Sequence, residues 1–328
     1  MKCINKWICL SLLIAVSCVS GCGKTSAAIE QPYDVYATAA DFGLSSNGTA
    51  EAKSYFASNL CVSEDVAIGT DSTDSQVAEG AGTFNLETNT VVYAKNLYER
   101  LYPASTTKIL TAYIALKYCD DLDAMVTVSE NAVNQASDSS VCNLKAGDVI
   151  RLRDLLYGLM LRSGNDAAVA IAEYISGDVD SFAALMNQEA AAMGATRSHF
   201  VNPNGLPDEN HYTCVYDMYL IFSNAIKNDP FVSIIGTTSY DVTYTDASGE
   251  AVTHTWENTN QYLTGNATTP DGFQIVGGKT GTTGEAGYCL VLYSYNPSGQ
   301  PIISIVFKAD GKSNLYLLMN EMLQGFAI

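Results

Sequence analysis

Three short segments of this chain carry side chains that could together perform nucleophilic chemistry. In order, they are Ser105-Thr106-Thr107-Lys108, Ser163-Gly164-Asn165 and Lys279-Thr280-Gly281. A serine hydroxyl is a poor nucleophile until a neighbouring base takes its proton. On a helix, Ser105 and Lys108 would lie on one face, one turn apart and within reach of each other. The pattern predicts a serine nucleophile activated by lysine, with a second hydroxyl and a second lysine completing the site.

Each motif is weak when it is taken alone. Ser-x-x-Lys occurs once, about as often as average composition gives by chance, and it also fits a helix N-cap followed by an ordinary lysine. Ser-x-Asn occurs four times, and Ser163 stands out because it interrupts two apolar helical stretches. Lys-Thr-Gly occurs once, next to Gly277 and Gly278, and also fits a plain edge strand with a turn. The order of the three motifs is what indicates a site.

The order and the surrounding residues resemble active-site serine penicillin-binding proteins and β-lactamases. They are most similar to low-molecular-weight D-alanyl-D-alanine carboxypeptidases of peptidase family S11. The nucleophile segment, Tyr102 to Lys108, is similar almost residue for residue. Residues 153–168, 200–206 and 284–288 are similar as well. The resemblance covers about residues 79 to 325.

The resemblance implies a role for each catalytic side chain. Ser105 would attack the carbonyl between the two terminal D-alanines of a peptidoglycan stem pentapeptide and form an acyl-enzyme. Lys108 is preferred over Lys279 as the general base, which requires it to be neutral part of the time. Burial and like-charge repulsion from Lys279 would both lower the pKa of Lys108. Ser163 would relay a proton to the departing D-alanine.

The resemblance also implies which residues hold the substrate. Asn165 would hold its peptide backbone, and the backbone N–H groups of Ser105 and Thr282 would form an oxyanion hole. Lys279, Thr280 and Thr282 would hold the terminal carboxylate, and Gly281 would belong to the same substrate-binding strand. β-Lactams would be covalent inhibitors, and neither a cofactor nor a metal is expected.

Two features depart from the family pattern. Relatives often carry a further C-terminal β-domain and an amphipathic anchor helix, whereas this sequence reaches Ile328 just past the catalytic region. Many relatives also place an arginine after the last hairpin to hold the carboxylate. Here that stretch reads Lys308-Ala309-Asp310-Gly311-Lys312, so the sequence leaves the affinity for the carboxylate open.

Other functions fit the sequence less well. A serine β-lactamase would need a positioned glutamate, and no segment matches that glutamate loop. A D,D-transpeptidase shares the acyl-enzyme and differs only in its acceptor, so it stays open. A non-catalytic β-lactam sensor would need a second apolar span, which the sequence lacks, and an inert relative would have lost part of the motif set. A metal-dependent peptidase is disfavoured because His199, His211 and His254 lack ligand spacing.

The N-terminus resembles a bacterial lipoprotein leader. Lys2 and Lys6 precede an apolar run from Trp7 to Val19, which is too short to span a bilayer comfortably. Val19-Ser20-Gly21-Cys22 resembles a lipobox, with an ordinary signal peptide as the alternative. We therefore expect a signal peptide at 1–21, a lipidated tether and extension at 22–78 and the penicillin-binding D,D-peptidase domain at 79–328. Lipid on Cys22 would hold the protein at the extracytoplasmic face of the membrane and replace the anchor helix.

Composition limits the partners. The formal net charge is −18, which disfavours nucleic acid. Hydrophobic residues make up 47% and charged residues 16%, which is typical of a folded chain. Beyond the leader and Cys22 the sequence has an odd number of cysteines, which we expect to be mainly buried free thiols rather than a disulfide framework. They are Cys61, Cys119, Cys142, Cys214 and Cys289.

The hydrophobic pattern predicts an α+β fold. Strands are expected at both ends of the catalytic region, as hairpins over 81–93 and 287–308. Helices are expected between them at 105–118, 152–161, 166–175 and 181–193, and a last helix at 314–323. The prediction is an antiparallel sheet formed by N- and C-terminal strands, flanked by helices and a mainly helical subdomain.

Overall fold

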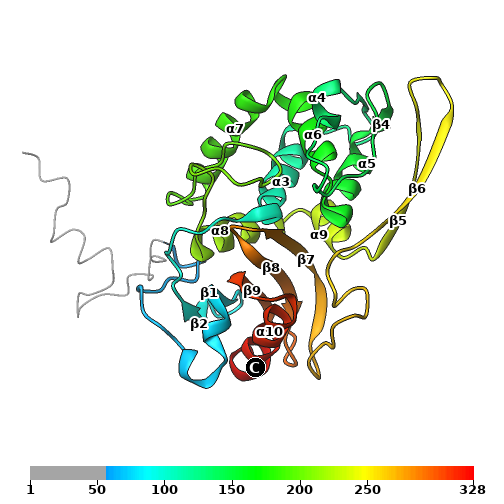
Figure 1. Cartoon of the computed structure of the whole chain (residues 1–328). Helices are drawn as coiled ribbons and strands as arrows, with labels where there is room; N and C mark the ends of the chain where they lie inside the picture. The colour runs from blue at the N-terminus through cyan, green and yellow to red at the C-terminus, as the bar shows by residue number, and fades with distance from the viewer. Residues whose placement is uncertain (1–56) are drawn as a thin grey trace, which may run out of the picture. The chain divides into compact units, whose positions relative to one another are not determined.

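A five-stranded antiparallel sheet joins the two ends of the folded region, as predicted (Figure 1). Its order is β2-β1-β9-β8-β7, so a strand from the start of the fold pairs with one from its end. In this pairing Ala81 lies opposite Val306 and Thr83 opposite Ser304. The strands are β1 (Ala78–Asn85), β2 (Thr90–Lys95), β7 (Gln274–Thr283), β8 (Gly287–Tyr295) and β9 (Pro301–Ala309).

Residues 57–328 are described in this computed structural model, and Asn59–Ile328 form one compact unit. The predicted leader and Cys22 lie outside the described residues. The compact unit includes residues 59–78, which the sequence analysis assigned to the extension. There the Cys61 backbone N–H donates to the Tyr219 hydroxyl at 2.9 Å, and the Tyr216 hydroxyl donates to the Cys61 carbonyl at 2.8 Å.

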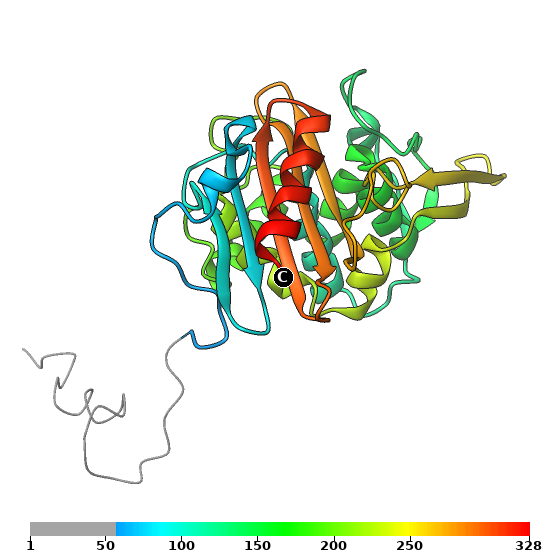
Figure 2. The ribbon, with the colours of Figure 1, turned by 90° about the horizontal axis from the view of Figure 1, so that it is seen from below.

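Both faces of the five-stranded sheet are covered. Helix α10 (Lys312–Phe326) lies along one face (Figure 2), and the helical layer covers the other. Because successive side chains of a strand point to opposite faces, β8 contributes to both cores. Leu290 and Leu292 pack in the core under α10, whereas Val291 and Tyr293 pack toward the helical layer.

The helical layer is built around α3 (Lys108–Tyr118), which is buried on nearly every side. Ile109, Leu110 and Ile114 of α3 are fully buried, in agreement with the apolar pattern that predicted a central helix. The remaining helices are α4 (Glu130–Val133), α5 (Leu152–Tyr157), α6 (Asn165–Ser176), α7 (Val179–Ala192), α8 (Val215–Ala225) and α9 (Asp229–Ile235).

A second, four-stranded sheet was not predicted. Its order is β3-β4-β5-β6, and its β5–β6 hairpin extends away from the helices (Figure 1). The strands are β3 (Met125–Thr127), β4 (Val149–Arg151), β5 (Ser239–Thr245) and β6 (Ala251–Glu257). The alternation in which Val242 and Tyr244 are buried between exposed polar neighbours is a strand signal. The sequence analysis overlooked it.

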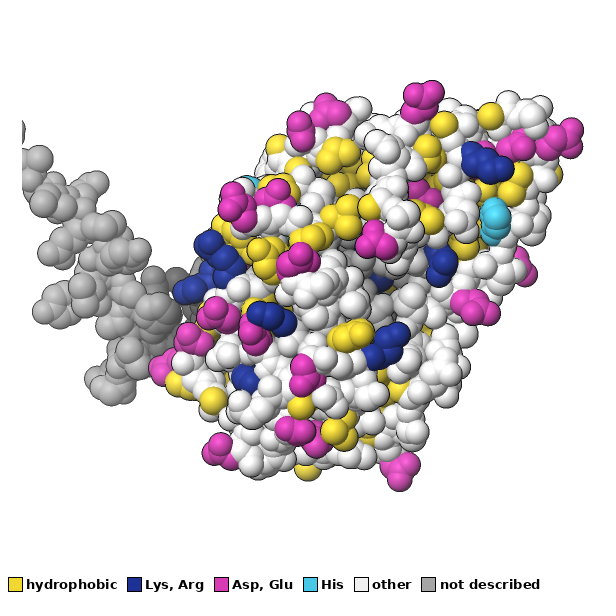
Figure 3. All heavy atoms as spheres, viewed as in Figure 1, with side chains coloured by type: hydrophobic (Ala, Val, Ile, Leu, Met, Phe, Trp, Pro, Cys, Tyr) yellow, Lys and Arg dark blue, Asp and Glu magenta, His cyan; other side chains and the backbone are white. Residues whose placement is uncertain are grey.

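Charge and cysteines follow the sequence expectations. On the face shown in Figure 3, acidic side chains are spread widely, and basic side chains stand singly or in small groups. Cys61, Cys119, Cys142, Cys214 and Cys289 are free thiols, and all but Cys119 are buried. Within residues 57–328, every helix is too short or too polar to cross a bilayer.

Candidate active site

Ser105 and Lys108 lie on one face of the chain, as the motif predicts. Ser105 belongs to a 3₁₀ turn, Ala104–Thr107, which continues directly into α3 at Lys108. The predicted α-helix therefore begins three residues later than expected. The Lys108 Nζ atom lies 2.9 Å from the Ser105 Oγ atom, within hydrogen-bonding distance. This places the amine where it can take the hydroxyl proton.

Lys108 is completely buried and held by groups from two other segments. Its Nζ atom lies 2.7 Å from the Asn165 Oδ1 atom and 2.6 Å from the Asn204 carbonyl oxygen. Burial lowers the pKa of Lys108 well below its ordinary value, and the positive charge of Lys279 acts in the same direction. The site therefore favours the neutral amine, which is the form that can accept a proton.

Lys279 reaches across from the sheet to the second serine. Its Nζ atom lies 3.0 Å from Ser163 Oγ and 2.9 Å from the Thr280 carbonyl oxygen. Burial lowers the pKa of Lys279 to about 7, so both of its protonation states are accessible near neutral pH. The hydrogen bond brings the second and third motifs into one site.

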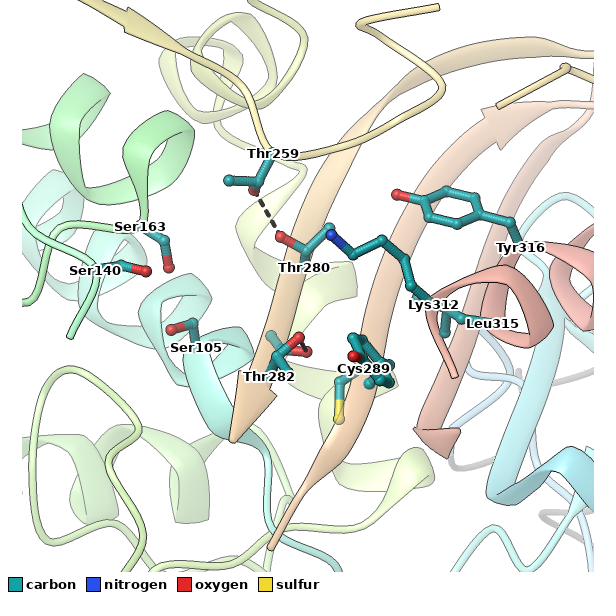
Figure 4. Close-up of a pocket in the computed structure, with 12 residues that line it drawn as sticks. Ser105, Ser140, Ser163, Thr259, Thr280, Thr282, Cys289, Lys312, Leu315 and Tyr316 are labelled. Carbon is teal, nitrogen blue, oxygen red and sulfur yellow. Dashed lines mark hydrogen bonds between the residues drawn. The ribbon is translucent and has the colours of Figure 1, made fainter. Parts of the chain in front are cut away.

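Ser163 adopts a backbone conformation that is uncommon for a residue with a side chain. A π-helical turn, Gly158–Arg162, extends α5 and ends at Ser163, where φ is 61° and ψ is 33°. Residues other than glycine in the left-handed region are uncommon and cluster at functional sites. The turn directs the Ser163 hydroxyl into the cavity (Figure 4).

A buried aspartate holds the loop that faces Ser105. The Asp166 carboxylate accepts backbone N–H groups from Cys142 at 2.9 Å and from Leu144 at 3.1 Å. The Asn165 backbone N–H donates to the Ser140 carbonyl at 2.8 Å. These bonds fix the loop against the start of α6, so Ser140 lines the cavity. The sequence analysis did not identify Ser140.

The third motif lies on β7, an edge strand of the five-stranded sheet. Gly281 permits close packing against the nucleophile turn, since a Cβ atom there would lie 2.9 Å from the Ser105 backbone nitrogen. Thr280 Oγ1 is hydrogen-bonded to Thr259 Oγ1 at 2.6 Å (Figure 4). An edge strand has backbone groups that the sheet leaves unpaired, which can receive an extended peptide.

These side chains line a cavity of about 230 Å³, which we call the carboxylate pocket. It brings Ser105, Ser163, Thr280, Gly281 and Thr282 together, all of them predicted. Further lining residues, which the sequence analysis did not assign to the site, are Ser140, Thr259, Tyr288, Cys289, Lys312, Leu315 and Tyr316.

Within the stretch 308–312, Lys312 is a basic residue that lines the cavity. It begins α10, and its side chain extends toward Thr280 (Figure 4). Lys308, from the same stretch, instead pairs with Glu79 at 2.8 Å and is absent from the pocket lining. A basic residue at the start of the last helix was the available sequence signal.

A second cavity of about 410 Å³ shares Ser105, Ser140 and Thr282 with the carboxylate pocket. We call it the stem groove. Its remaining lining residues are Asp138, Ser139, Asn165, Asn204, Gly205, Leu206, Pro207, Thr283, Gly284 and Glu285. Asn165 therefore lines this groove and also contacts Lys108.

His211 is hydrogen-bonded to the nucleophile turn, Ala104–Thr107. Its Nδ1 atom accepts the Val201 backbone N–H at 3.1 Å, so its Nε2–H donates to Thr107 Oγ1 at 2.8 Å. Burial lowers the pKa of His211 to about 4, which keeps the ring neutral.

Within the described residues, no group of three or more His, Cys, Asp or Glu side chains is arranged to hold a metal.

The known proteins that this chain resembles are named D-alanyl-D-alanine carboxypeptidases. D-alanyl-D-alanine carboxypeptidase DacF of Bacillus subtilis (strain 168) is 34% identical over 251 residues, covering 75% of this chain and 61% of that protein. The D-alanyl-D-alanine carboxypeptidase of Streptomyces sp. (strain K15) is 34% identical over 265 residues, covering 76% and 88%. This chain thus spans about three fifths of the length of DacF.

The fold comparison agrees. The crystal structure of the Streptomyces K15 DD-transpeptidase superimposes with a TM-score of 0.71 at 32% identity, covering 77% of this chain and 98% of that one. The family model described as D-alanyl-D-alanine carboxypeptidase, Peptidase_S11, matches residues 69–311. With most of the folded region matched, the chain belongs to the D-alanyl-D-alanine carboxypeptidase family.

Proposed function

We propose that this protein is a serine D-alanyl-D-alanine carboxypeptidase that removes the terminal D-alanine from peptidoglycan stem pentapeptides. The observation that carries the proposal is a pair of lysine–serine contacts, Lys108 with Ser105 and Lys279 with Ser163, whose two serines line one cavity. The first supplies a nucleophile and its base, and the second supplies a hydroxyl for the leaving group.

Acylation transfers the peptidyl group from the nitrogen of the terminal D-alanine to the hydroxyl of Ser105. Neutral Lys108 takes the Ser105 proton as Ser105 Oγ bonds to the carbonyl carbon of the penultimate D-alanine. The backbone N–H groups of Ser105 and Thr282 stabilise the negative charge on the carbonyl oxygen. The carbon–nitrogen bond then breaks, and the departing amine receives a proton through Ser163. Attack by water on the ester releases the shortened peptide and restores Ser105.

The carboxylate pocket explains why a C-terminal residue is required. Thr280 and Thr282 offer hydroxyl groups to this pocket, and Lys312 offers an ammonium group. Lys279 does not line the pocket; it contacts the lining residue Ser163. Since the pKa of Lys279 is lowered to about 7, Lys279 alone would carry only part of a positive charge at neutral pH. We therefore assign Lys312 a binding role beside the residues predicted from sequence. The peptide would extend along β7 toward Asn165.

A second candidate function differs in the molecule that accepts the acyl group. The relative from Streptomyces sp. (strain K15) is named a D-alanyl-D-alanine carboxypeptidase, and the solved Streptomyces K15 structure is named a DD-transpeptidase. The two reactions share an acyl-enzyme and differ in the molecule that accepts the acyl group. A D,D-transpeptidase is therefore the second candidate function. Adding an amine acceptor to the assay separates the two: a carboxypeptidase yields mainly the hydrolysed tetrapeptide, and a transpeptidase yields mainly the aminolysis product.

The first test is mass spectrometry of a D-Ala-D-Ala-terminated pentapeptide incubated with the full chain in detergent. Loss of one alanine by the wild type and none by Ser105→Ala supports the proposal. Labelling with a fluorescent penicillin should disappear in Ser105→Ala, while circular dichroism shows that the fold is retained. An unchanged peptide would overturn the carboxypeptidase assignment, and labelling that survives in Ser105→Ala would place the nucleophile elsewhere.

The proposed location is the extracytoplasmic face of the membrane, with residues 1–21 as leader, Cys22 as the lipid attachment site and residues 23–58 as tether. Support comes from the lipobox-like sequence and from a family that acts on the cell wall. Cys22→Ala should move the protein from the membrane pellet to the soluble fraction after cell lysis. A protein that stays in the pellet would sink the lipid-anchor proposal.

A further inference from the structure

A further cavity, of about 310 Å³, shares no lining residue with the carboxylate pocket or the stem groove. We call it the β6 pocket. Four consecutive residues of β6, 254–257, line it together with Asn143 and Arg162. Arg162 ends the π-helical turn and directly precedes Ser163. The β6 pocket therefore adjoins the turn that carries a catalytic serine, although none of its lining residues takes part in the mechanism above.

The β6 pocket runs along the free edge of a strand. β6 is the end strand of its sheet, so only β5 pairs with it (Figure 1). Successive side chains of a strand point to opposite faces, so a cavity that touches four consecutive residues follows the edge of the strand rather than one face. Within residues 57–328, the backbone groups of 254–257 bond only to β5. The pocket thus presents unpaired backbone groups that an extended peptide could join.

The pocket also contains side-chain donors that lack acceptors. Arg162 is exposed, and within the described residues its guanidinium forms neither an ion pair nor a hydrogen bond. Trp256 is 2% exposed, and its buried Nε1–H has no hydrogen-bond acceptor among these residues. A buried donor without a partner is costly unless water or a ligand accepts from it. Both observations point to a ligand that brings acceptor oxygens.

The charges that line the pocket favour a single carboxylate. Arg162 is the only lysine or arginine in the lining, and Glu257 is the only acid. His254 also lines it, with its ring stacked on Tyr244. A guanidinium matches a carboxylate through two parallel hydrogen bonds. Because Glu257 opposes a second negative charge, a monoanion should bind better than phosphate.

We propose that the β6 pocket is a second binding site, separate from the catalytic cavities, for the C-terminal end of a peptide. The terminal carboxylate would bind Arg162, and the peptide groups before it would pair with the free edge of β6. The shortened peptide that the proposed reaction releases has this chemistry. The inference goes beyond the proposed carboxypeptidase function and does not depend on it, since binding at this pocket requires no catalysis.

Trp256 gives the pocket a signal of its own. The sequence contains two tryptophans, Trp7 and Trp256, so in a Trp7→Phe protein all tryptophan fluorescence comes from the pocket. The probe is N-acetyl-D-alanine, and N-acetyl-D-alaninamide, which lacks the carboxylate, is the matched control ligand. An exposed cavity with one arginine predicts weak binding, with a Kd of about 1 mM or above. Titration of the full chain in detergent should change the fluorescence with the acid and not with the amide.

Two arginine variants of the Trp7→Phe protein test the contact. Arg162→Gln should weaken the binding of N-acetyl-D-alanine about three- to tenfold, because it removes one exposed charge pair. The matched control is Arg153→Gln, since Arg153 is also exposed but pairs with Asp123 at 3.2 Å and does not line the pocket. This control should keep the original Kd, and circular dichroism shows that each variant is folded. Acylation with penicillin blocks Ser105, and the response to N-acetyl-D-alanine should survive it.

Each other result overturns the inference. A response that disappears after acylation would assign the binding to the active site, and equal Kd values for the two arginine variants would remove Arg162 from the contact. Equal affinity for the amide or for inorganic phosphate would show that the pocket does not select a carboxylate. Tighter binding of free D-alanine would show that it selects a zwitterion rather than a peptide end. No response, together with no binding in calorimetry, would exclude the site.

Discussion

Lys279 on strand β7 and Ser163 at the end of the π-helical turn are joined by a 3.0 Å hydrogen bond, which connects the sheet to the helical layer. Both side chains are buried, and Ser163 holds its place through a left-handed backbone conformation. Ser140 offers another hydroxyl in the same cavity, yet it is not bonded to a lysine. The geometry therefore separates a hydroxyl that can pass a proton from one that only lines the pocket.

The first prediction tests this difference. Ser163→Ala is expected to lower kcat for D-alanine release by about 10²-fold or more, as is typical when a group in proton transfer is removed. Ser140→Ala should lower kcat far less, because Ser140 lacks the contact with Lys279. Steady-state kinetics on a D-Ala-D-Ala peptide measure both variants. Equal losses in the two variants would argue against a relay through Ser163.

The second prediction concerns pH. The pKa of Lys279 is lowered to about 7, so Lys279 loses its positive charge as pH rises through this value. Because we propose that this charge helps to hold the substrate carboxylate, KM should rise above about pH 7. Lys279→Arg, whose guanidinium stays protonated, should keep KM low at higher pH. An identical alkaline rise in this variant would remove Lys279 from carboxylate binding.

The third prediction compares two lysines of one stretch. Lys312→Ala should raise KM for D-Ala-D-Ala peptides by about three- to tenfold, because an exposed charge–charge contact is worth about 1 kcal/mol. Lys308→Ala removes the same charge but only breaks the exposed pair with Glu79, so its KM should match that of the wild type. Matching KM values for the two variants would show that Lys312 does not contact the carboxylate.

Local sequence patterns account for the five-stranded sheet's terminal hairpins, for several helices and for the motif residues. The hairpins at both ends and the buried helix α3 were predicted because alternation and apolar content are local signals. Ser105, Lys108, Asn165 and Lys279 are brought together as their motifs required. The left-handed backbone conformation of Ser163 could not be predicted from such patterns, because the packing of two helices imposes it.

The residues that sequence reasoning did not assign reach the site through long-range packing. Lys312 enters the carboxylate pocket because α10 crosses the sheet, and Ser140 enters because Asp166 holds its loop. Thr259 is placed by the segment that follows the β5–β6 hairpin. No periodicity in the chain indicates these contacts. The β5–β6 hairpin itself carried an alternating pattern. The sequence therefore contained the signal, and the sequence analysis failed to use it.

The fourth prediction concerns stability in acid. The pKa of His211 is about 4 in the folded protein and near 6.5 in an unfolded chain, so between these values only the unfolded chain binds the proton. The free energy of unfolding should therefore fall by up to about 3 kcal/mol as pH is lowered from 6.5 to 4. His211→Gln should lose this part of the slope in urea titrations. A slope unchanged by the substitution would contradict the prediction.

The last prediction uses two glycines with the same backbone angle. Gly205 and Gly177 both have φ of 88°, but a Cβ atom on Gly205 would lie 1.8 Å from the Ala104 carbonyl oxygen, whereas one on Gly177 meets nothing within 4 Å. Gly177→Ala should cost about 1–2 kcal/mol of unfolding free energy from the left-handed backbone alone. Gly205→Ala should cost more, because the loop must move away from the nucleophile turn.

Movement of the loop in Gly205→Ala should also slow catalysis, whereas Gly177→Ala should leave catalysis unchanged. The Asn204 carbonyl, one residue before Gly205, lies 2.6 Å from Lys108 Nζ, so displacement of the loop would leave the buried amine without one of its partners. We expect penicillin acylation to slow at least tenfold in Gly205→Ala and to be unaffected in Gly177→Ala, at a temperature where both are folded. Acylation that is equally fast in the two variants would mean that the loop does not position Lys108.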